Sequence, residues 1–284
     1  MLPNFLIIGA QKSGTSWLHA MLRQHPDVFM PEAELHFFDK RHHFERGVAW
    51  YERHFADAGG HAAIGEKTPD YLWANGQGVE GHLPDVHRNL HAVVPDARLI
   101  VVLRNPVERA VSAVLHLLRT RRVSPIHSLD DLLVGRGRDL VRGHGVIEYG
   151  FYCEQLEAYL ELFDRDRMLV LFFEEDVRDD PASTLRRVCA FLGIDPGHPF
   201  AEASEGVNVA RRSRLGLLAD FYLPALGALW RRGDALLPAY RPTPSDAVLR
   251  ELYALYDEPN QRLFRLLGRR AASWAPLRPP TPNA

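Results

Sequence analysis

The sequence has few cysteines, no long apolar run and almost no net charge. Its 284 residues include only two cysteines, Cys153 and Cys189, which form no CxxC pair, so a disulfide scaffold is excluded and two reduced thiols are expected. Clean apolar runs such as residues 99–103 and 168–173 are far shorter than the ~20 residues of a membrane-spanning helix. A formal net charge of −2 gives no overall attraction to nucleic acid or to anionic membranes.

The N-terminal residues show no targeting pattern, because residues 5–8 lead directly from a short apolar stretch into a glycine turn. The composition, 46% hydrophobic and 25% charged, is that of an ordinary globular protein. We therefore expect a cytoplasmic protein with no nucleic-acid partner and no transmembrane segment. The oligomeric state stays open, and any anion site must come from a local group of Lys and Arg.

Patterns of buried strands and amphipathic helices alternate along the chain. Continuous apolar runs predict strands at residues 5–8, 98–103 and 168–173 of a sheet covered on both faces. Helices are expected at residues 16–24, 107–121, 152–163, 181–192 and 247–257, the last ended or kinked by Pro259 before a further helical run to residue 267. This alternation predicts an α/β fold of three layers, P-loop-like, with a central parallel sheet flanked by helices.

The domain organisation follows from the same pattern. We expect a single domain over residues 1–273, with loop-rich insertions at residues 119–145 and 207–240. The last residues, 274–284, carry four prolines and predict a flexible tail.

A glycine loop follows the first predicted strand. Residues 9–16 read GAQKSGTS and precede a helix, so free backbone N–H groups and the helix N-terminus favour an anion there. A simple capped turn is the alternative. Gly9 and Gly14 have the spacing of a Walker A loop, but Lys12 stands before the second glycine and Thr15 directly after it.

A second cation follows the strand predicted at residues 98–103. Arg104 stands where NTPases place the carboxylate that holds Mg²⁺, which disfavours metal-dependent triphosphate hydrolysis and predicts no metal site. Ser112 lies near two turns into the next helix and offers a hydroxyl for the same anion. Alone, Arg104 is equally well explained by a salt bridge. Together with the Lys12 loop, it favours two separate anion sites.

These segments resemble the sulfotransferases that use 3′-phosphoadenosine 5′-phosphosulfate (PAPS). IIGAQKSGTSWL is similar to their 5′-phosphosulfate loop, and RLIVVLRNPVERAVS to their 3′-phosphate segment. ELHFFD, GVAWYERHF, EKTPDYL and LYDEPNQRLFRLLGR resemble the heparan sulfate N- and 3-O-sulfotransferase branch. The resemblance implies PAPS as donor, adenosine 3′,5′-bisphosphate as product and no metal. The missing disulfide loop and membrane anchor of the animal enzymes suggest a free-standing, bacterial-type enzyme.

The resemblance also implies the residues that bind the donor. It implies that the 5′-phosphosulfate is bound by Lys12, Ser13, Gly14, Thr15 and Ser16, with Trp17 beneath the loop or near the purine. It implies that the 3′-phosphate is bound by Arg104 and Ser112. A later basic loop corresponds to Arg211, Arg212 and Arg214, where the sequence departs from the Lys-Gly-Arg pattern of the animal enzymes.

Two side chains compete for the role of general base, Glu34 and His36. The resemblance favours Glu34, whereas other sulfotransferases use a His. In an extended segment both would share one face, and partial burial would raise the pKa of a carboxylate base to a useful value. The resemblance places Lys67 near the transferring sulfate, with Lys12 suited to the leaving oxygen. Glu66 is either a structural carboxylate or a third candidate base.

The leading prediction is a sulfotransferase. It would move a sulfuryl group in line, without a metal, to a hydroxyl or amine of a saccharide, glycolipid or secondary metabolite. One alternative is a P-loop small-molecule kinase that uses Mg-ATP, and another is a non-catalytic nucleotide-binding module. Neither alternative accounts for the ELHFFD and EKTPDY segments.

Overall fold

The computed structural model describes residues 1–75, 81–201, 212–224, 234 and 236–275. The chain divides into two compact units, neither of which is one continuous segment. The first comprises Met1–Asn105, Phe151–Glu205 and Pro259–Ala275, and the second Pro106–Gly150, Gly206–Glu258 and Pro276–Ala284. The single domain expected over residues 1–273 stays a prediction.

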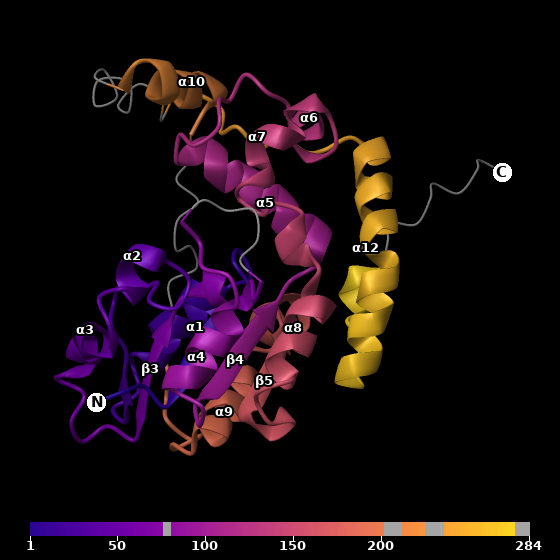
Figure 1. Cartoon of the computed structure of the whole chain (residues 1–284). Coiled ribbons are helices and arrows are strands. Elements are labelled where there is room, and N and C mark those ends of the chain that lie inside the picture. Colours follow the sequence, from indigo (N-terminus) through magenta and orange to yellow (C-terminus); the bar gives the residue numbers. More distant parts are fainter. Residues whose placement is uncertain (76–80, 202–211, 225–233, 235, 276–284) are drawn as a thin grey trace. The chain divides into compact units, whose positions relative to one another are not determined.

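A parallel sheet of five strands forms the centre of the first unit (Figure 1). Leu6 and Ile8 of the central strand pack into one core and Phe5 and Ile7 into another, so the sheet is buried on both faces. In spatial order the strands are β2 (Val28–Phe29), β3 (Ala63–Lys67), β1 (Phe5–Gly9), β4 (Arg98–Leu103) and β5 (Met168–Phe172).

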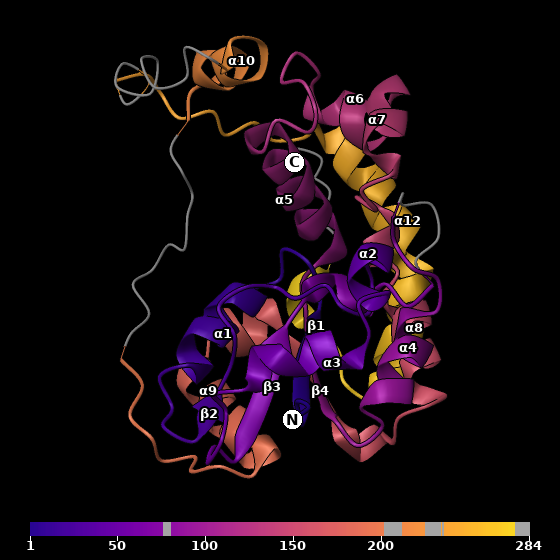
Figure 2. The ribbon, with the colours of Figure 1, turned by 60° about the vertical axis from the view of Figure 1, so that its left-hand side comes forward.

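Helices cover both faces of this sheet. Figure 2 shows α1 (Thr15–Leu22) and α9 (Pro181–Leu192) at one face, and α4 (Val86–Val93) and α8 (Tyr152–Leu160) at the other. Two short helices, α2 (Arg41–Phe44) and α3 (Val48–Glu52), come between β2 and β3 in the chain. The expected three-layer α/β fold with a central parallel sheet is confirmed.

The described part of the second unit is helical. The helices are α5 (Pro106–Arg119), α6 (Leu129–Leu133), α7 (Asp139–Arg142), α10 (Arg214–Tyr222) and the first part of α12 (Asp246–Leu267). The two insertions expected to be loop-rich therefore contain short helices. Pro259 lies inside α12, and the helix continues past it to Leu267.

The strand β3 was missed by the sequence analysis. Its residues Gly65, Glu66 and Lys67 do not form an apolar run, yet every residue of the strand is buried. Gly65 packs so closely against β1 that a Cβ atom there would lie 2.4 Å from the Phe5 ring. In contrast, β4 and α9 have the predicted boundaries, because their apolar patterns are continuous.

The end of the chain differs from the prediction at Trp274. The sequence predicts that the flexible tail begins at this residue, but its side chain is buried and its indole N–H donates to Glu174 at 3.0 Å. The rest of the predicted tail, residues 276–284, lies outside the described residues. Among the helices that the structure describes, none is both long enough and apolar enough to cross a membrane.

Candidate active site

The loop between β1 and α1 has the backbone of an anion cradle. Gly14 adopts a φ of +90°, and a Cβ atom at this position would lie 2.7 Å from the Phe173 ring, so a larger residue is strained and crowded there. Lys12 also has a positive φ, +68°. Since α1 begins at Thr15, its N-terminal N–H groups and its partial positive charge lie at the end of this loop.

Ser13 gives an independent sign that the loop holds a polar group. Its side chain is fully buried, and its Oγ has no hydrogen-bond partner in the described part of the chain. A buried hydroxyl without a partner costs about 1–3 kcal/mol, which a bound acceptor oxygen would recover. Trp17, two residues into α1, packs against the core on its side of the sheet. The loop therefore fits a phosphate or phosphosulfate group.

The structure brings Arg104 to this loop. It directly follows β4, the parallel neighbour of β1, and its Nη1 donates to the Lys12 carbonyl oxygen at 3.3 Å. Its guanidinium carbon lies 5.2 Å from the centre of the Phe173 ring, so one aromatic side chain lies beside both Gly14 and Arg104. The strand end is held by Glu174, whose Oε1 accepts the Asn105 N–H at 3.0 Å. The two predicted anion-binding segments thus lie side by side.

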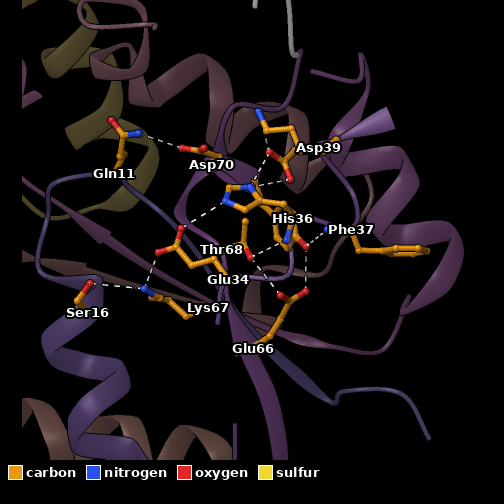
Figure 3. A network of polar contacts seen from close by, with 12 residues as sticks. Gln11, Ser16, Glu34, His36, Phe37, Asp39, Glu66, Lys67, Thr68 and Asp70 are labelled. Atoms are coloured by element: carbon orange, nitrogen blue, oxygen red, sulfur yellow. Dashed lines mark hydrogen bonds and ion pairs between the residues drawn. The ribbon is translucent and has the colours of Figure 1, made fainter. Parts of the chain in front are cut away.

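Lys67 connects this loop to the predicted base. Its Nζ lies 2.5 Å from Glu34 Oε1 and 3.5 Å from the Oγ of Ser16, which is on α1 (Figure 3). Lys67 is the last residue of the buried strand β3, and only 9% of its side chain is exposed. A single buried cation therefore contacts both the carboxylate and the start of the helix after the glycine loop.

From the sequence, a raised pKa was expected for Glu34. The structure shows the opposite, because the pKa of Glu34 is lowered to about 2. Burial raises it, but the hydrogen bonds from His36 and Lys67 and the charges of both outweigh burial. The Glu34 side chain is 37% exposed, and its Oε2 lies 3.4 Å from His36 Nε2. Glu34 is therefore a carboxylate at neutral pH that is accessible to solvent.

The chain is bent at His36, and the contact between the side chains of His36 and Glu34 is made across this bend, not along an extended segment. Its φ is +50°, in the left-handed region, so the sharing of one face by alternate residues does not apply here. Its Nδ1 lies 3.0 Å from Oδ2 of the fully buried Asp39. Burial lowers the pKa of His36, but its hydrogen bonds to Asp39 and Glu34 raise it to about 10. His36 is thus a cation between two carboxylates.

Glu66 lies deeper than these residues. Its side chain is fully buried, and its carboxyl oxygens accept hydrogen bonds from Tyr51 at 2.6 Å, Tyr71 at 3.0 Å and Thr68 at 3.1 Å. Burial raises its pKa to about 7, although these hydroxyls lower it. No acceptor reaches Glu66 directly while it is enclosed in this way.

Other predicted donor-binding residues are not placed at this cluster. Ser112 lies on α5, and Arg214 lies at the start of α10. Both belong to the second unit. Arg212 also belongs to that unit, where its Nη1 lies 3.2 Å from Asp234 Oδ2. Arg211 lies outside the described residues. The roles of these four residues stay predictions.

Asp39 and Thr68 are site residues that the sequence analysis did not single out. Asp39 lies three residues after His36 in the ELHFFD segment, a spacing that allows contact across one turn. Thr68 directly follows Lys67, and its Oγ1 accepts the His36 N–H at 3.4 Å. The spacing of Asp39 was a usable signal, whereas the Thr68 contact joins residues 32 positions apart.

One group of side chains has an arrangement that metal ions use. Ligand atoms of His36, Asp39 and Asp70 lie within 4.8 Å of one another. The pKa of about 10 keeps a proton on His36, and a protonated imidazole is no metal ligand until the proton leaves. The expected absence of a metal stays a prediction.

Comparisons with known proteins agree with this geometry. The model of the sulfotransferase domain family matches residues 2–207. Human heparan sulfate glucosamine 3-O-sulfotransferase 6 is 30% identical over 271 residues, 94% of this chain and 72% of that protein. Mouse heparan sulfate glucosamine 3-O-sulfotransferase 3B1 is 32% identical over 274 residues, 94% of this chain and 64% of that protein. The chain thus spans about two thirds of the length of these relatives.

A solved structure is similar over nearly the whole chain. The sulfotransferase from Alicyclobacillus acidocaldarius has a TM-score of 0.70 and 27% identity, and the match covers 96% of this chain and 99% of that one. These matches decide against the kinase and the non-catalytic module. The family model, the curated relatives and the solved structure all lead to one conclusion: the chain belongs to the sulfotransferase family and is a sulfotransferase enzyme.

Proposed function

We propose that the protein transfers a sulfuryl group from PAPS to a hydroxyl or amine of an acceptor, with Glu34 as the general base. Support for the donor comes from two adjacent anion-binding segments, the Lys12 loop and Arg104, which suit a ligand with two separate phosphate groups. The unpartnered buried hydroxyl of Ser13 fits the phosphosulfate.

The observation that carries the proposal is the position of Lys67. It contacts Glu34 on one side and Ser16, the last residue of the glycine segment 9–16, on the other. A group bound in the loop and an acceptor next to Glu34 are therefore neighbours. This proximity is what a direct transfer requires, because holding two reactants in line converts a bimolecular step into a unimolecular one.

The chemistry follows from these positions. Glu34 accepts the proton of the acceptor hydroxyl while the hydroxyl oxygen of the acceptor forms a bond to sulfur. At the same time, the bond between sulfur and the phosphate oxygen of PAPS breaks. Lys12 would neutralise the charge that develops on that phosphate oxygen. His36 stays protonated, since its pKa is about 10, and it orients Glu34 instead of acting as the base.

Lys67 also gives the site a means of activating Glu34. An anion bound at the loop competes with Glu34 for the Lys67 ammonium. When Lys67 donates to this anion instead of to Glu34, its hydrogen bond no longer lowers the pKa of Glu34. Glu34 would then be a stronger base when the donor is bound than when it is not.

The acceptor that we propose first is a saccharide. The curated relatives are named for heparan sulfate glucosamine, and their sequences cover 94% of this chain. A glycolipid or a secondary metabolite remains an alternative acceptor of the same chemistry. We also propose that the reaction needs no metal and takes place in the cytoplasm.

Ligand binding in EDTA tests the donor. We expect adenosine 3′,5′-bisphosphate to raise the melting temperature, because a ligand at one hundred times its Kd adds about 2.7 kcal/mol to the stability of the folded state. ATP is the matched control, and we expect a much smaller rise. A rise with ATP that requires Mg²⁺, and none with the bisphosphate, would refute both the donor and the absence of a metal.

A further inference from the structure

The backbone between residues 36 and 38 is held by side chains and not by a neighbouring strand. The His36 N–H donates to Thr68 Oγ1 at 3.4 Å. The Phe37 N–H donates to the Tyr71 hydroxyl at 2.8 Å, and the Phe38 N–H reaches the same oxygen at 3.5 Å. Three consecutive amides thus depend on two hydroxyl groups.

Both hydroxyl groups donate in turn to one carboxyl group. Thr68 Oγ1 donates to Glu66 Oε2 at 3.1 Å, and the Tyr71 hydroxyl donates to Oε1 at 3.0 Å. Because these two protons point at Glu66, the lone pairs of both oxygens are left to accept the backbone amides. Figure 3 shows Glu66 below Thr68 and His36, on the side away from Asp39.

The bend that these contacts hold is strained. A residue other than glycine with a φ of +50° persists only when its surroundings fix it. The bend is also what brings the His36 ring between Glu34 Oε2, at 3.4 Å, and Asp39 Oδ2, at 3.0 Å.

We propose that Glu66 is a positioning residue that acts through Thr68 and Tyr71 to hold the bend at His36, and so keeps His36 paired with Glu34. The role rests on the proposed function, in which Glu34 is the base. It differs from a role in core stability alone, because it is transmitted by the two hydroxyl groups that touch the backbone of residues 36–38.

The chain offers matched controls. Tyr51 donates to the same Glu66 Oε1 at 2.6 Å and is as buried as Tyr71, but its hydroxyl makes no contact with the amides of residues 36–38 in the described structure. The Tyr51 ring stacks on Phe37, and Tyr51→Phe keeps that ring. Thr68→Val removes the hydroxyl at nearly constant volume, and Thr68→Ser restores it.

The first test needs no acceptor. The imidazole of His36 is titrated by NMR in the full chain, with its signals assigned from a His36→Gln spectrum. Its titration reports the carboxyl groups that face it, which are Glu34, Asp39 and Asp70. We expect Glu66→Gln, whose Nε2 cannot accept a hydroxyl proton, to lower the pKa of His36 from about 10 toward 6.5, as should Tyr71→Phe and Thr68→Val. Tyr51→Phe and Thr68→Ser should leave this pKa unchanged. Two pairs of variants are compared: Tyr71→Phe with Tyr51→Phe, and Thr68→Val with Thr68→Ser. The proposal is overturned if the pKa of His36 falls equally in both members of each pair, or in neither.

The second test is the rate of transfer from PAPS to heparan sulfate. A displacement of about 1 Å costs up to about 100-fold, so we expect Tyr71→Phe and Thr68→Val to lower kcat at least about tenfold with an unchanged KM for PAPS. Thr68→Ser restores the rate, and Tyr51→Phe stays within about threefold of the wild type. Equal rates for Thr68→Val and Thr68→Ser refute the positioning role even if Tyr71→Phe does not fold. If the wild type transfers nothing, the proposed acceptor is wrong, and the NMR titration still decides the role of Glu66.

Discussion

Glu34→Gln is the substitution that most directly tests the proposed mechanism. The amide has nearly the same shape, so its oxygen still accepts from Lys67 at the position that Oε1 holds at 2.5 Å. It cannot accept a proton from the acceptor. Loss of a general base costs about 10²- to 10⁴-fold in rate, which corresponds to about 3–5 kcal/mol in the activation barrier.

The cost in stability is much smaller and has a defined pH dependence. A pKa of about 2 instead of 4.5 corresponds to about 3 kcal/mol, but the Glu34 side chain is 37% exposed and solvent screens it, so we expect about 1 kcal/mol. Because the pKa is lowered, this contribution is present above pH 4.5 and is lost as the pH falls toward 2. Urea unfolding at pH 7 and at low pH measures it.

The assay is kcat for transfer from PAPS, with heparan sulfate as the first acceptor. Glu32→Gln is the matched control, because Glu32 lies two residues away on the same segment and its side chain is 88% exposed. We expect the control to keep the wild-type rate and Glu34→Gln to lose at least about 100-fold with an unchanged Kd for adenosine 3′,5′-bisphosphate. A Glu34→Gln rate within about threefold of the wild type would refute the assignment of the base.

Three further predictions follow from the site. Lys12→Ala should lower kcat by about 10²- to 10³-fold in a chain with an unchanged circular dichroism spectrum, and full activity would remove Lys12 from the mechanism. Arg104→Ala should weaken adenosine 3′,5′-bisphosphate about 10- to 100-fold and adenosine 5′-phosphate little. Equal losses would contradict a 3′-phosphate site, and Arg98→Ala, at the other end of β4, is the control. Since burial raises the pKa of Glu66 to about 7, the folded chain loses about 3 kcal/mol between pH 4.5 and 7. Glu66→Gln should remove that loss in urea unfolding, and an unchanged pH dependence would show that Glu66 is ionised throughout.

The elements that the sequence predicted well are those with local signals. A continuous apolar run is sufficient to identify β4, and Pro181 with Gly193, which adopts a φ of +76°, marks the two ends of α9. The glycine loop is also local, because its spacing and the following helix are written within eight residues. These features depend on backbone sterics and hydrophobic periodicity, which act over a few neighbouring residues.

The strand β3 shows where that reasoning fails. Glu66 and Lys67 are charged in sequence but buried in the fold, because tyrosines 51 and 71 enclose the first and Glu34 neutralises the second. Neither partner can be recognised from the strand itself. Burial of a charged residue depends on what the rest of the chain supplies, so a local pattern does not predict it.

The candidate residues were therefore determined by sequence, and their chemical states by tertiary structure. The residue types and spacing around Lys12 are enough to predict an anion loop, and the family resemblance adds Glu34 and His36 as candidate bases. Only the fold decides that the pKa of Glu34 is lowered and that of His36 raised, since both values depend on contacts with Lys67 and Asp39. Lys67 is 33 residues from Glu34 in the chain but 2.5 Å away in space. The interaction between two charges depends on their separation in space and on their exposure to water, and tertiary folding fixes both.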